Sequence, residues 1–273
     1  MKHIRAKLVT ITLCLLLIPI CGCRMNTTSG SNPGNTVDVS ETLTQISTID
    51  AVLAGIYDGV VDFGILREYG DFGIGTFEGL DGEMLGFDGQ FYQVRSDGIA
   101  YPVSSSMKTP FASVTFFETD FSKRLPADMN YEELQAFLNN CLPTDNLFYA
   151  IRIDGEFGYM KTRSVPAQEK PYPPLVEVTG EQPTFEFKNV SGTVAGFRLP
   201  DYAAGVNMPG YHLHFINEDK NGGGHILDLR TGDCLATIDY TREFYMILPD
   251  DSSDFYGVDF SQDRSDELEE AEK

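Results

Sequence analysis

The body of the chain, from Val60 onward, consists of short apolar runs that glycine and aspartate interrupt. Runs of this kind, bounded by turn-forming residues and rich in β-branched and aromatic side chains, are typical of antiparallel strands. The pattern predicts strands at residues 73–77, 82–87, 91–95, 99–103, 112–118, 148–153, 184–187, 190–199, 211–216, 224–230 and 234–240. The sequence shows no internal repeat.

Apolar positions at helical spacing are confined to a few short segments. Residues 47–56 begin with Ser47, which we expect to cap a helix. Another helix is expected after Asn130, because Glu133 follows it at the spacing of a capping box. The very acidic tail, residues 263–273, also has a helical pattern.

A proline-rich segment interrupts the predicted strands. Residues 165–174 contain four prolines, and proline cannot donate a hydrogen bond to a β-ladder. We expect this irregular connection to separate two sub-domains, with the boundary near residues 165–180. The predicted fold class is α+β: predominantly antiparallel or mixed β-sheet in two packed sub-domains, with a few short helices.

The start of the chain has the pattern of an export signal. Three basic residues precede an apolar run at residues 8–20, which is too short for a comfortable bilayer span. The run ends in Ile-Cys-Gly-Cys, which resembles a bacterial lipobox with Cys23 as the lipid acceptor. We therefore predict a lipoprotein signal peptide at residues 1–22. An ordinary signal peptide and a freely secreted product are the alternative.

Export would leave the protein attached through Cys23 to the outer face of the bacterial cytoplasmic membrane. Residues 23–41 are rich in Asn, Thr, Ser and Gly, which predicts a flexible tether before a folded body at residues 42–273. Export also permits a disulfide between Cys141 and Cys234, although two buried thiols are equally compatible with the sequence.

The chain is strongly acidic, with 41 Asp and Glu residues against 20 Lys and Arg residues. Such a chain repels nucleic acid and anionic lipid headgroups. We therefore expect no nucleic-acid partner, and contact with a membrane only through the lipid on Cys23.

The chain has four histidines, and three of them lie close together in the sequence. His212 and His214 are two residues apart in a predicted strand, so both side chains point to the same face. The turn-prone residues 221–224 can then reverse the chain and return His225 on the neighbouring strand. Three neutral imidazoles leave one position open on a metal ion, as in catalytic zinc sites. Zinc is favoured, and manganese, iron or nickel could substitute for it.

Two charged residues are further candidates. Glu83 lies in a predicted strand between glycines, where another group can approach closely. Arg163 could hold a substrate carboxylate through two parallel hydrogen bonds. Spacing alone favours the interpretation of Glu83 as an ordinary exposed strand acid and of Arg163 as an exposed salt-bridging arginine. Arg152 competes with Arg163 for the same role. The acidic tail alone would be a solvated helix face.

Several long motifs resemble the α-acetolactate decarboxylases. They are Gly73–Tyr92, Arg95–Gly98, Arg163–Leu175 and Gly210–Phe215, and the similarity extends from Gln45 to the end of the chain. The resemblance implies a zinc enzyme, a carboxy-lyase of the acetoin and butanediol pathway, that converts 2-acetolactate to acetoin and carbon dioxide.

The resemblance also implies roles for individual residues. His212, His214 and His225 would be the zinc ligands, Glu83 the acid that faces the metal, and Arg163 the active-site arginine in preference to Arg152.

The family also uses a glutamate from its C-terminal segment. The tail offers Glu267, Glu269, Glu270 and Glu272. We select Glu272 as the third catalytic residue because it follows the small Ala271 near the end of the chain.

The implied chemistry suits such a site. Loss of carbon dioxide from a β-keto acid leaves an electron pair that the adjacent ketone oxygen must receive. Zinc would stabilise the resulting enediolate as a Lewis acid, and no organic cofactor is needed. Arg163 would orient the carboxylate, and a glutamate or metal-bound water would return the proton.

Two other functions remain open at this point. One is a metal-dependent ligand-binding lipoprotein without catalytic activity. The other is a cupin-like metalloenzyme, because His212, His214 and Glu218 loosely resemble the first cupin motif. A cupin usually needs a later histidine, and none follows His225. The expected partners are the small-molecule substrate and a second copy of the chain in a homodimer.

Overall fold

The computed structural model describes residues 41–251 and 253–272. The predicted signal peptide, the acceptor Cys23 and the predicted tether up to residue 40 lie outside the described residues. Within the described part, no helix is both long and apolar enough to cross a membrane.

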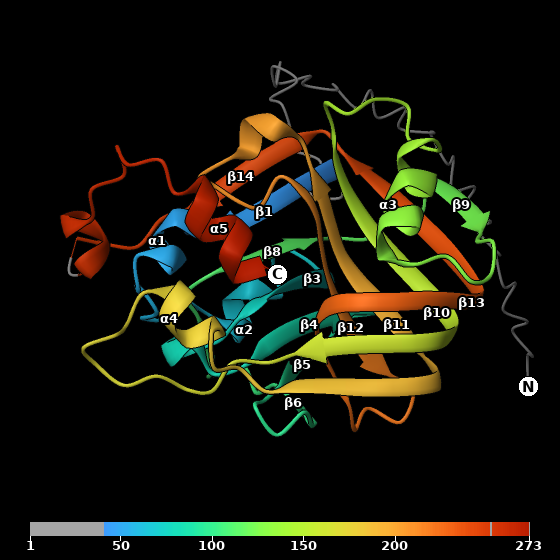
Figure 1. Ribbon diagram of the computed structural model, residues 1–273. Helices are drawn as coiled ribbons and strands as arrows, with labels where there is room; N and C mark the ends of the chain where they lie inside the picture. Colours follow the sequence, from blue (N-terminus) through green and yellow to red (C-terminus); the bar gives the residue numbers. More distant parts are fainter. Residues whose placement is uncertain (1–40, 252, 273) are drawn as a thin grey trace, which may run out of the picture. The chain divides into compact units, whose positions relative to one another are not determined.

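Seven short strands form the first sheet (Figure 1). In spatial order they are β14 (Glu243–Ile247), β1 (Thr42–Ile46), β8 (Ala112–Thr115), β3 (Phe72–Thr76), β4 (Glu83–Phe87), β5 (Gln90–Val94) and β6 (Ala100–Pro102). Neighbouring strands are antiparallel, except that β1 and β14 run parallel. Five of these strands confirm predicted runs, whereas β1 and β14 lie outside every predicted strand.

The second sheet contains longer strands than the sequence pattern predicts. Its members are β10 (Phe148–Arg163), β11 (Thr184–Leu199), β12 (Gly210–Asn217), β13 (Gly223–Thr241) and β9 (Phe121–Arg124). β13 also pairs with β10, so β10, β11, β12 and β13 close on themselves. Gly155 in β10 has a φ of 151°, which bends the strand locally. The pairing with β13 shifts its register after this glycine, so the strand continues beyond it.

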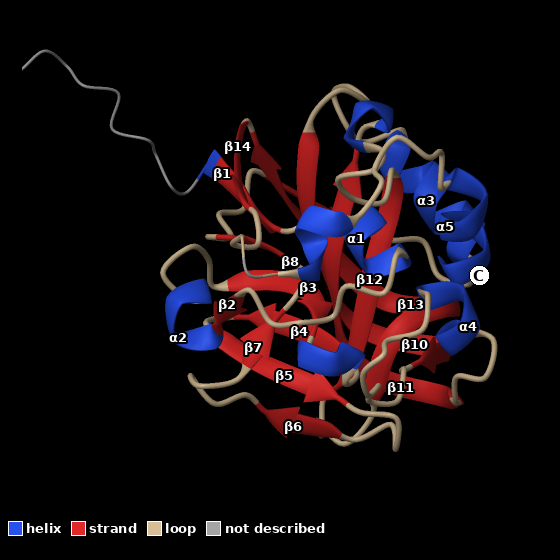
Figure 2. Ribbon diagram, turned by 90° about the vertical axis from the view of Figure 1, so that its left-hand side faces the viewer, coloured by secondary structure: helices blue, strands red, loops and turns tan. Residues whose placement is uncertain are grey.

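Short helices complete the body, as Figure 2 shows. The α-helices are α1 (Ile49–Leu53), α2 (Phe63–Leu66), α3 (Tyr131–Asn139), α4 (Leu175–Thr179) and α5 (Ser265–Glu272). Single-turn 3₁₀ helices lie at Glu78–Leu80, Asp201–Ala203 and Asp254–Gly257, and β2 (Val61–Asp62) pairs with β7 (Lys108–Thr109).

The helix ends test the predicted caps. Asn130 and Glu133 form the predicted capping box of α3. The cap predicted at Ser47 is wrong: the side chain of Thr48 caps α1 by accepting from the backbone N–H of Ala51. Ser47 has a φ of 56°, which is outside the extended conformation of a helix cap.

The proline-rich segment joins two strands of one sheet. β10 and β11 flank residues 165–180 and pair with each other along nearly their whole lengths, so both belong to the second sheet. The sub-domain boundary near residues 165–180 stays a prediction. The chain passes from the first sheet to the second between β8 and β9.

Two apolar clusters determine where the site forms. In the first, Phe72 from the first sheet packs edge-to-face on Phe197 from the second, with ring centroids 5.9 Å apart. This cluster holds the two sheets together. In the second, α1, α4 and α5 pack in one cluster that includes Leu53, Leu175 and Ala271. The same packing brings the C-terminal helix against residues that are distant in sequence.

Cys141 and Cys234 are both free thiols. Cys234 is buried and Cys141 is half-buried, so the disulfide that the sequence allowed does not form.

Candidate active site

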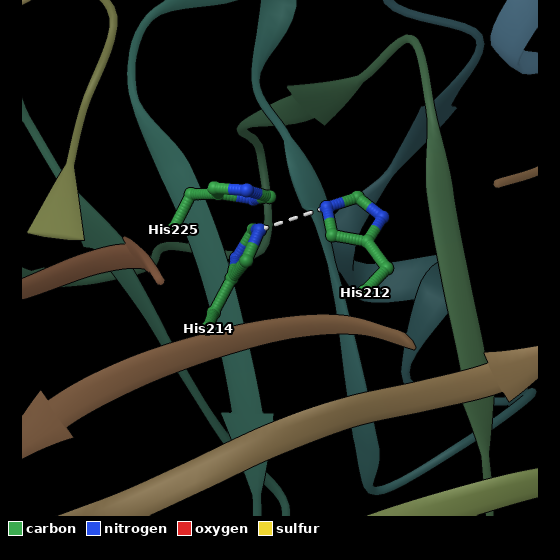
Figure 3. A group of neighbouring side chains, drawn as sticks. All are labelled: His212, His214 and His225. Carbon is green, nitrogen blue, oxygen red and sulfur yellow. Dashed lines mark hydrogen bonds between the residues drawn. The ribbon is translucent and has the colours of Figure 1, made fainter. Parts of the chain in front are cut away.

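Three histidine side chains meet where β12 pairs with β13 (Figure 3). His212 and His214 project from one face of β12, and His214 is the register partner of His225 on β13. One ring nitrogen of each lies within 4.8 Å of the others, and the ring centroids are 5.0 to 5.4 Å apart. This geometry confirms the predicted return of His225 beside the other two.

Burial keeps these imidazoles neutral. None of the three residues is more than 7% exposed. Burial, with a smaller contribution from the Arg163 guanidinium, lowers the pKa of His212 to about 3. Burial is also the main reason that the pKa values of His214 and His225 lie well below their usual range. Each neutral ring therefore keeps a lone pair that can bind a cation.

A backbone carbonyl fixes the tautomer of His214. Its Nδ1 lies 2.8 Å from the carbonyl oxygen of Met84, which can only accept a hydrogen bond. The proton is therefore on Nδ1, and Nε2 has the lone pair. This Nε2 faces Nε2 of His212 at 3.2 Å. Outer hydrogen bonds of this kind orient metal-ligating histidines, but a main-chain contact leaves no signal in the sequence.

Glu83 begins β4 and is buried, only 6% exposed, so the interpretation as an exposed strand acid is wrong. Its Oε2 lies 3.6 Å from Nε2 of His214. Burial raises the pKa of Glu83 to about 7, although the nearby Arg163 lowers it in part. The preceding Gly82 has a φ of +85°, and an added Cβ would lie 2.2 Å from the carbonyl oxygen of Val94. Only glycine allows this close turn.

Arg163 ends β10 as the register partner of His225 and is 4% exposed. Its Nη1 lies 3.3 Å from Oε1 of Glu83, and its Nη2 donates to the carbonyl oxygen of Ala271 at 3.0 Å. The competing Arg152 instead pairs with Asp88 and Asp154. The structure thus brings Arg163, and not Arg152, to the histidines.

Glu272 reaches the same place from α5. Its Oε2 lies 3.2 Å from Nε2 of His225 and 3.8 Å from Nη2 of Arg163. Among the described residues, no group donates a hydrogen bond to this oxygen. Burial raises the pKa of Glu272. Of the other tail acids, Glu267 pairs with Arg264, while Glu269 and Glu270 are exposed. The structure therefore places the selected glutamate beside the histidines.

Two cavities adjoin these residues, and His225 and Glu272 line both. The inner chamber has a volume of about 40 Å³ and reaches Glu83, Arg163 and His212. The outer pocket has a volume of about 710 Å³ and lies between α3, α5 and residues 204–209. The end of α5 thus borders both the chamber at the histidines and the wider outer pocket.

Fold and site together define a class of protein: a two-sheet β protein whose buried histidine cluster, flanked by two carboxyl groups and a guanidinium, has the composition of an enzyme active site. A protein-family model described as "Alpha-acetolactate decarboxylase" matches residues 43–262.

Individual relatives agree with this match. The alpha-acetolactate decarboxylase of Methanosarcina mazei is 54% identical over 86% of this chain and 82% of its own. That of Bacillus subtilis is 48% identical over 80% of this chain and 88% of its own. A crystal structure of the enzyme from Bacillus subtilis strain 168 superposes with a TM-score of 0.82, at 46% identity, and covers 85% of this chain and 99% of that one.

The chain belongs to the alpha-acetolactate decarboxylase family and is an enzyme, an acetolactate decarboxylase. The fold class predicted from the sequence is confirmed by the same structural match. A non-catalytic binding protein and a cupin-like enzyme are therefore no longer the best interpretations.

Proposed function

We propose that His212, His214 and His225 hold one zinc ion, and that this centre decarboxylates 2-acetolactate to acetoin and carbon dioxide. The observation that supports the metal is the pair of Nε2 atoms of His212 and His214, 3.2 Å apart, with the proton of His214 held on Nδ1 by Met84. In a tetrahedral site, zinc–nitrogen bonds of about 2.0–2.1 Å bring two ligand nitrogens to a separation of this size.

The surrounding carboxyl groups also suit a cation. Glu83 Oε2 and Glu272 Oε2 each lie within 3.6 Å of a histidine Nε2. Among the described residues, Glu272 Oε2 is buried and accepts no hydrogen bond, although Nη2 of Arg163 lies 3.8 Å away. A metal cation closer to this oxygen would further compensate the cost of burying a carboxylate. The donor set therefore fits zinc, which would supply Lewis-acid stabilisation of the charge that develops as carbon dioxide leaves.

Each charged residue has a distinct part in the proposed reaction. Arg163 binds the substrate carboxylate, and its two NH₂ groups already contact carboxyl or carbonyl oxygens at this position. Cleavage of the bond to carbon dioxide leaves its electron pair on the former ketone. Glu83, a buried acid beside His214, then delivers a proton to carbon, which completes acetoin. Glu272 lines both cavities beside His225 and Arg163, where it can orient these two groups toward the substrate.

The test uses the full chain, loaded with zinc and incubated with racemic acetolactate. We expect acetoin of one predominant chirality, loss of activity on chelation, and recovery when zinc is restored. Elemental analysis should give one zinc per chain. Turnover that persists after complete removal of the metal would contradict the zinc proposal, and unchanged acetolactate would contradict the reaction.

We also infer that the enzyme is exported and attached by lipid on Cys23. The inference depends on the basic and apolar start of the chain and the Ile-Cys-Gly-Cys sequence. The wild type should partition with membranes of a bacterial host and incorporate labelled fatty acid. Cys23→Ala should lose both properties, whereas Cys141→Ala should keep them. Equal labelling of the two variants would exclude Cys23 as the acceptor.

A further inference from the structure

Helix α5 borders the inner chamber through Glu272, and its own sequence makes it a weak helix. Five of its eight residues are Asp or Glu, and its last turn contains no basic side chain. Acidic side chains three or four positions apart repel each other, and negative charge at the C-terminal end opposes the helix dipole. A helix of this length is also too short to be stable alone. Contacts with the rest of the protein therefore hold α5 in place.

Leu268, Ala271 and Glu272 attach α5 to the body. Leu268 is partly buried and Ala271 is fully buried, and both pack in the apolar cluster of α1 and α4. The backbone carbonyl of Ala271 accepts from Nη2 of Arg163 at 3.0 Å, and Oε2 of Glu272 lies 3.2 Å from Nε2 of His225. Leu268 and Glu272 are four residues apart, so they lie on the same face of the helix. The position of Glu272 therefore depends on the packing of Leu268.

With α5 in this position the chamber is closed to the substrate. Its volume of about 40 Å³ holds roughly three water molecules, which is less than the carbon and oxygen atoms of acetolactate need. The outer pocket, about 710 Å³, has the size of a small-molecule site. His225 and Glu272 line both cavities. His225 is fixed between its ladder partners Arg163 and His214, whereas Glu272 ends a weak helix. A path between the two cavities therefore opens when the end of α5 moves.

We propose that α5 is a lid between the outer pocket and the histidine cluster, and that Leu268 is the residue that holds it closed. The lid opens to let the substrate pass from the outer pocket, and closes to return Glu272 to His225 and Arg163. This inference rests on the proposed function, because it takes the chamber as the place of the reaction. Arg163 donates to the lid through the carbonyl of Ala271, so the residue proposed to bind the substrate carboxylate also contacts the lid.

The histidines of the chamber measure the opening of the lid. Diethyl pyrocarbonate modifies imidazoles that solvent can reach, and His3 is the only other histidine in the chain. The metal-free full chain is treated with this reagent, and peptide mass spectrometry gives the modification rates of His212, His214 and His225. Leu268→Ala should raise these rates about tenfold, since truncating a partly buried leucine shifts a local opening equilibrium by about this factor. Leu268→Met conserves volume and should stay within about twofold of the wild type.

Leu147→Ala is the matched control. Leu147 is also partly buried, but it packs against the apolar cluster around Phe157 and Leu229 and lines neither cavity. Its truncation should change the modification rates by less than about twofold. Equal increases in Leu268→Ala and Leu147→Ala would mean that general loss of stability exposes the histidines, and would reject the lid. Unchanged rates in Leu268→Ala would also reject it.

A stabilising variant tests the lid in the opposite direction and does not depend on the folding of Leu268→Ala. Glu270 is exposed near the C-terminal end of α5, one turn after Asp266 and Glu267. Glu270→Lys replaces this repulsion by attraction and complements the helix dipole, so the modification rates should fall by about two- to fivefold. Rates that stay the same or rise would contradict the proposal.

The zinc-loaded full chain separates failure of the lid from failure of the proposed function. Release of zinc to excess chelator should be about tenfold faster in Leu268→Ala than in the wild type, and unchanged in Leu147→Ala. If these differences hold while acetolactate stays unchanged, only the proposed reaction fails. If acetoin forms but the differences are absent, the lid is wrong and the proposed function stands.

Discussion

A buried carboxyl group with a pKa raised to about 7 lies at each end of the β10–β13 pair: Glu83 of β4 at one end and Asp239 of β13 at the other. At one end, where Arg163 pairs with His225, Glu83 lies within 3.6 Å of both a guanidinium and an imidazole. At the other end Ala150 pairs with Asp239, which is 2% exposed and accepts a long 3.4 Å hydrogen bond from the backbone N–H of Glu118.

The charged neighbours explain the difference between these ends. The charges that act on Asp239 are those of Asp120, Glu41 and Glu118, all of the same sign. Glu83 instead has the guanidinium of Arg163, which lowers its pKa, beside the carboxyl group of Glu272, which raises it, and it lines a chamber. A raised carboxyl pKa therefore does not identify a catalytic site by itself. A catalytic site is identified when opposite charges, lone pairs and a cavity occur together.

The largest effect should come from removing a metal ligand at the histidine end. His212→Ala should abolish zinc binding and lower kcat/KM by about 10³-fold or more, because a bound cation contributes several kcal/mol to the transition state. Zinc content and acetoin production are measured together. Asp239→Asn is the control at the other end and should keep both. An alanine variant that makes acetoin at the native rate would refute the site.

The next largest effect should distinguish the two buried acids, Glu83 and Asp239, by the kcat of their amide variants. Glu83→Gln removes the proposed proton donor and should lower kcat by about 10²-fold or more, with zinc still bound. Asp239→Asn is an equally conservative change of another buried acid and should leave kcat unchanged. Steady-state kinetics at matched zinc content provide the test. If both variants lose the same activity, the distinction between the two ends is wrong.

A smaller loss is expected for the arginine. Arg163→Lys keeps the charge but loses the paired donors that orient a carboxylate, and a misplaced substrate can cost about 10²-fold in kcat/KM. Arg152→Lys is the control, because Arg152 pairs with Asp88 and Asp154 and not with the site. It should alter kcat/KM by no more than about twofold. Similar losses of kcat/KM in both variants would show that Arg163 contributes only to the stability of the fold.

Local sequence patterns predict the parts of the site that neighbouring residues determine. The strand positions of His212 and His214 and the turn before His225 follow from periodicity and turn chemistry, so the cluster could be expected from the sequence. The roles of Glu83 and Arg163 could not, because each depends on contacts with distant segments. Only the family resemblance selected them.

Tertiary contacts determine the remaining features. β10 is longer than its apolar run because it pairs on both sides, with β11 and with β13, before and after Gly155. The carbonyl of Met84 and the side chain of Phe111 reach the site through packing between segments that are not adjacent in sequence. Neither position has a composition or spacing that distinguishes it from an ordinary core residue.

The last prediction concerns stability at the Asp239 end. Burial raises the pKa of Asp239 from 3.8 to about 7 in the folded protein. Between these values the folded state keeps a proton that the unfolded state has lost, so stability falls as the pH rises from about 4 to 7 and is constant above that range. Asp239→Asn has no proton to lose and can still accept from Glu118. Its Tm should therefore exceed that of the wild type at pH 8, by a few degrees, and the difference should shrink toward pH 5. Glu83 and Glu272 are common to both proteins and cancel in this difference. A Tm difference that is independent of pH would show that Asp239 stays ionised in the fold.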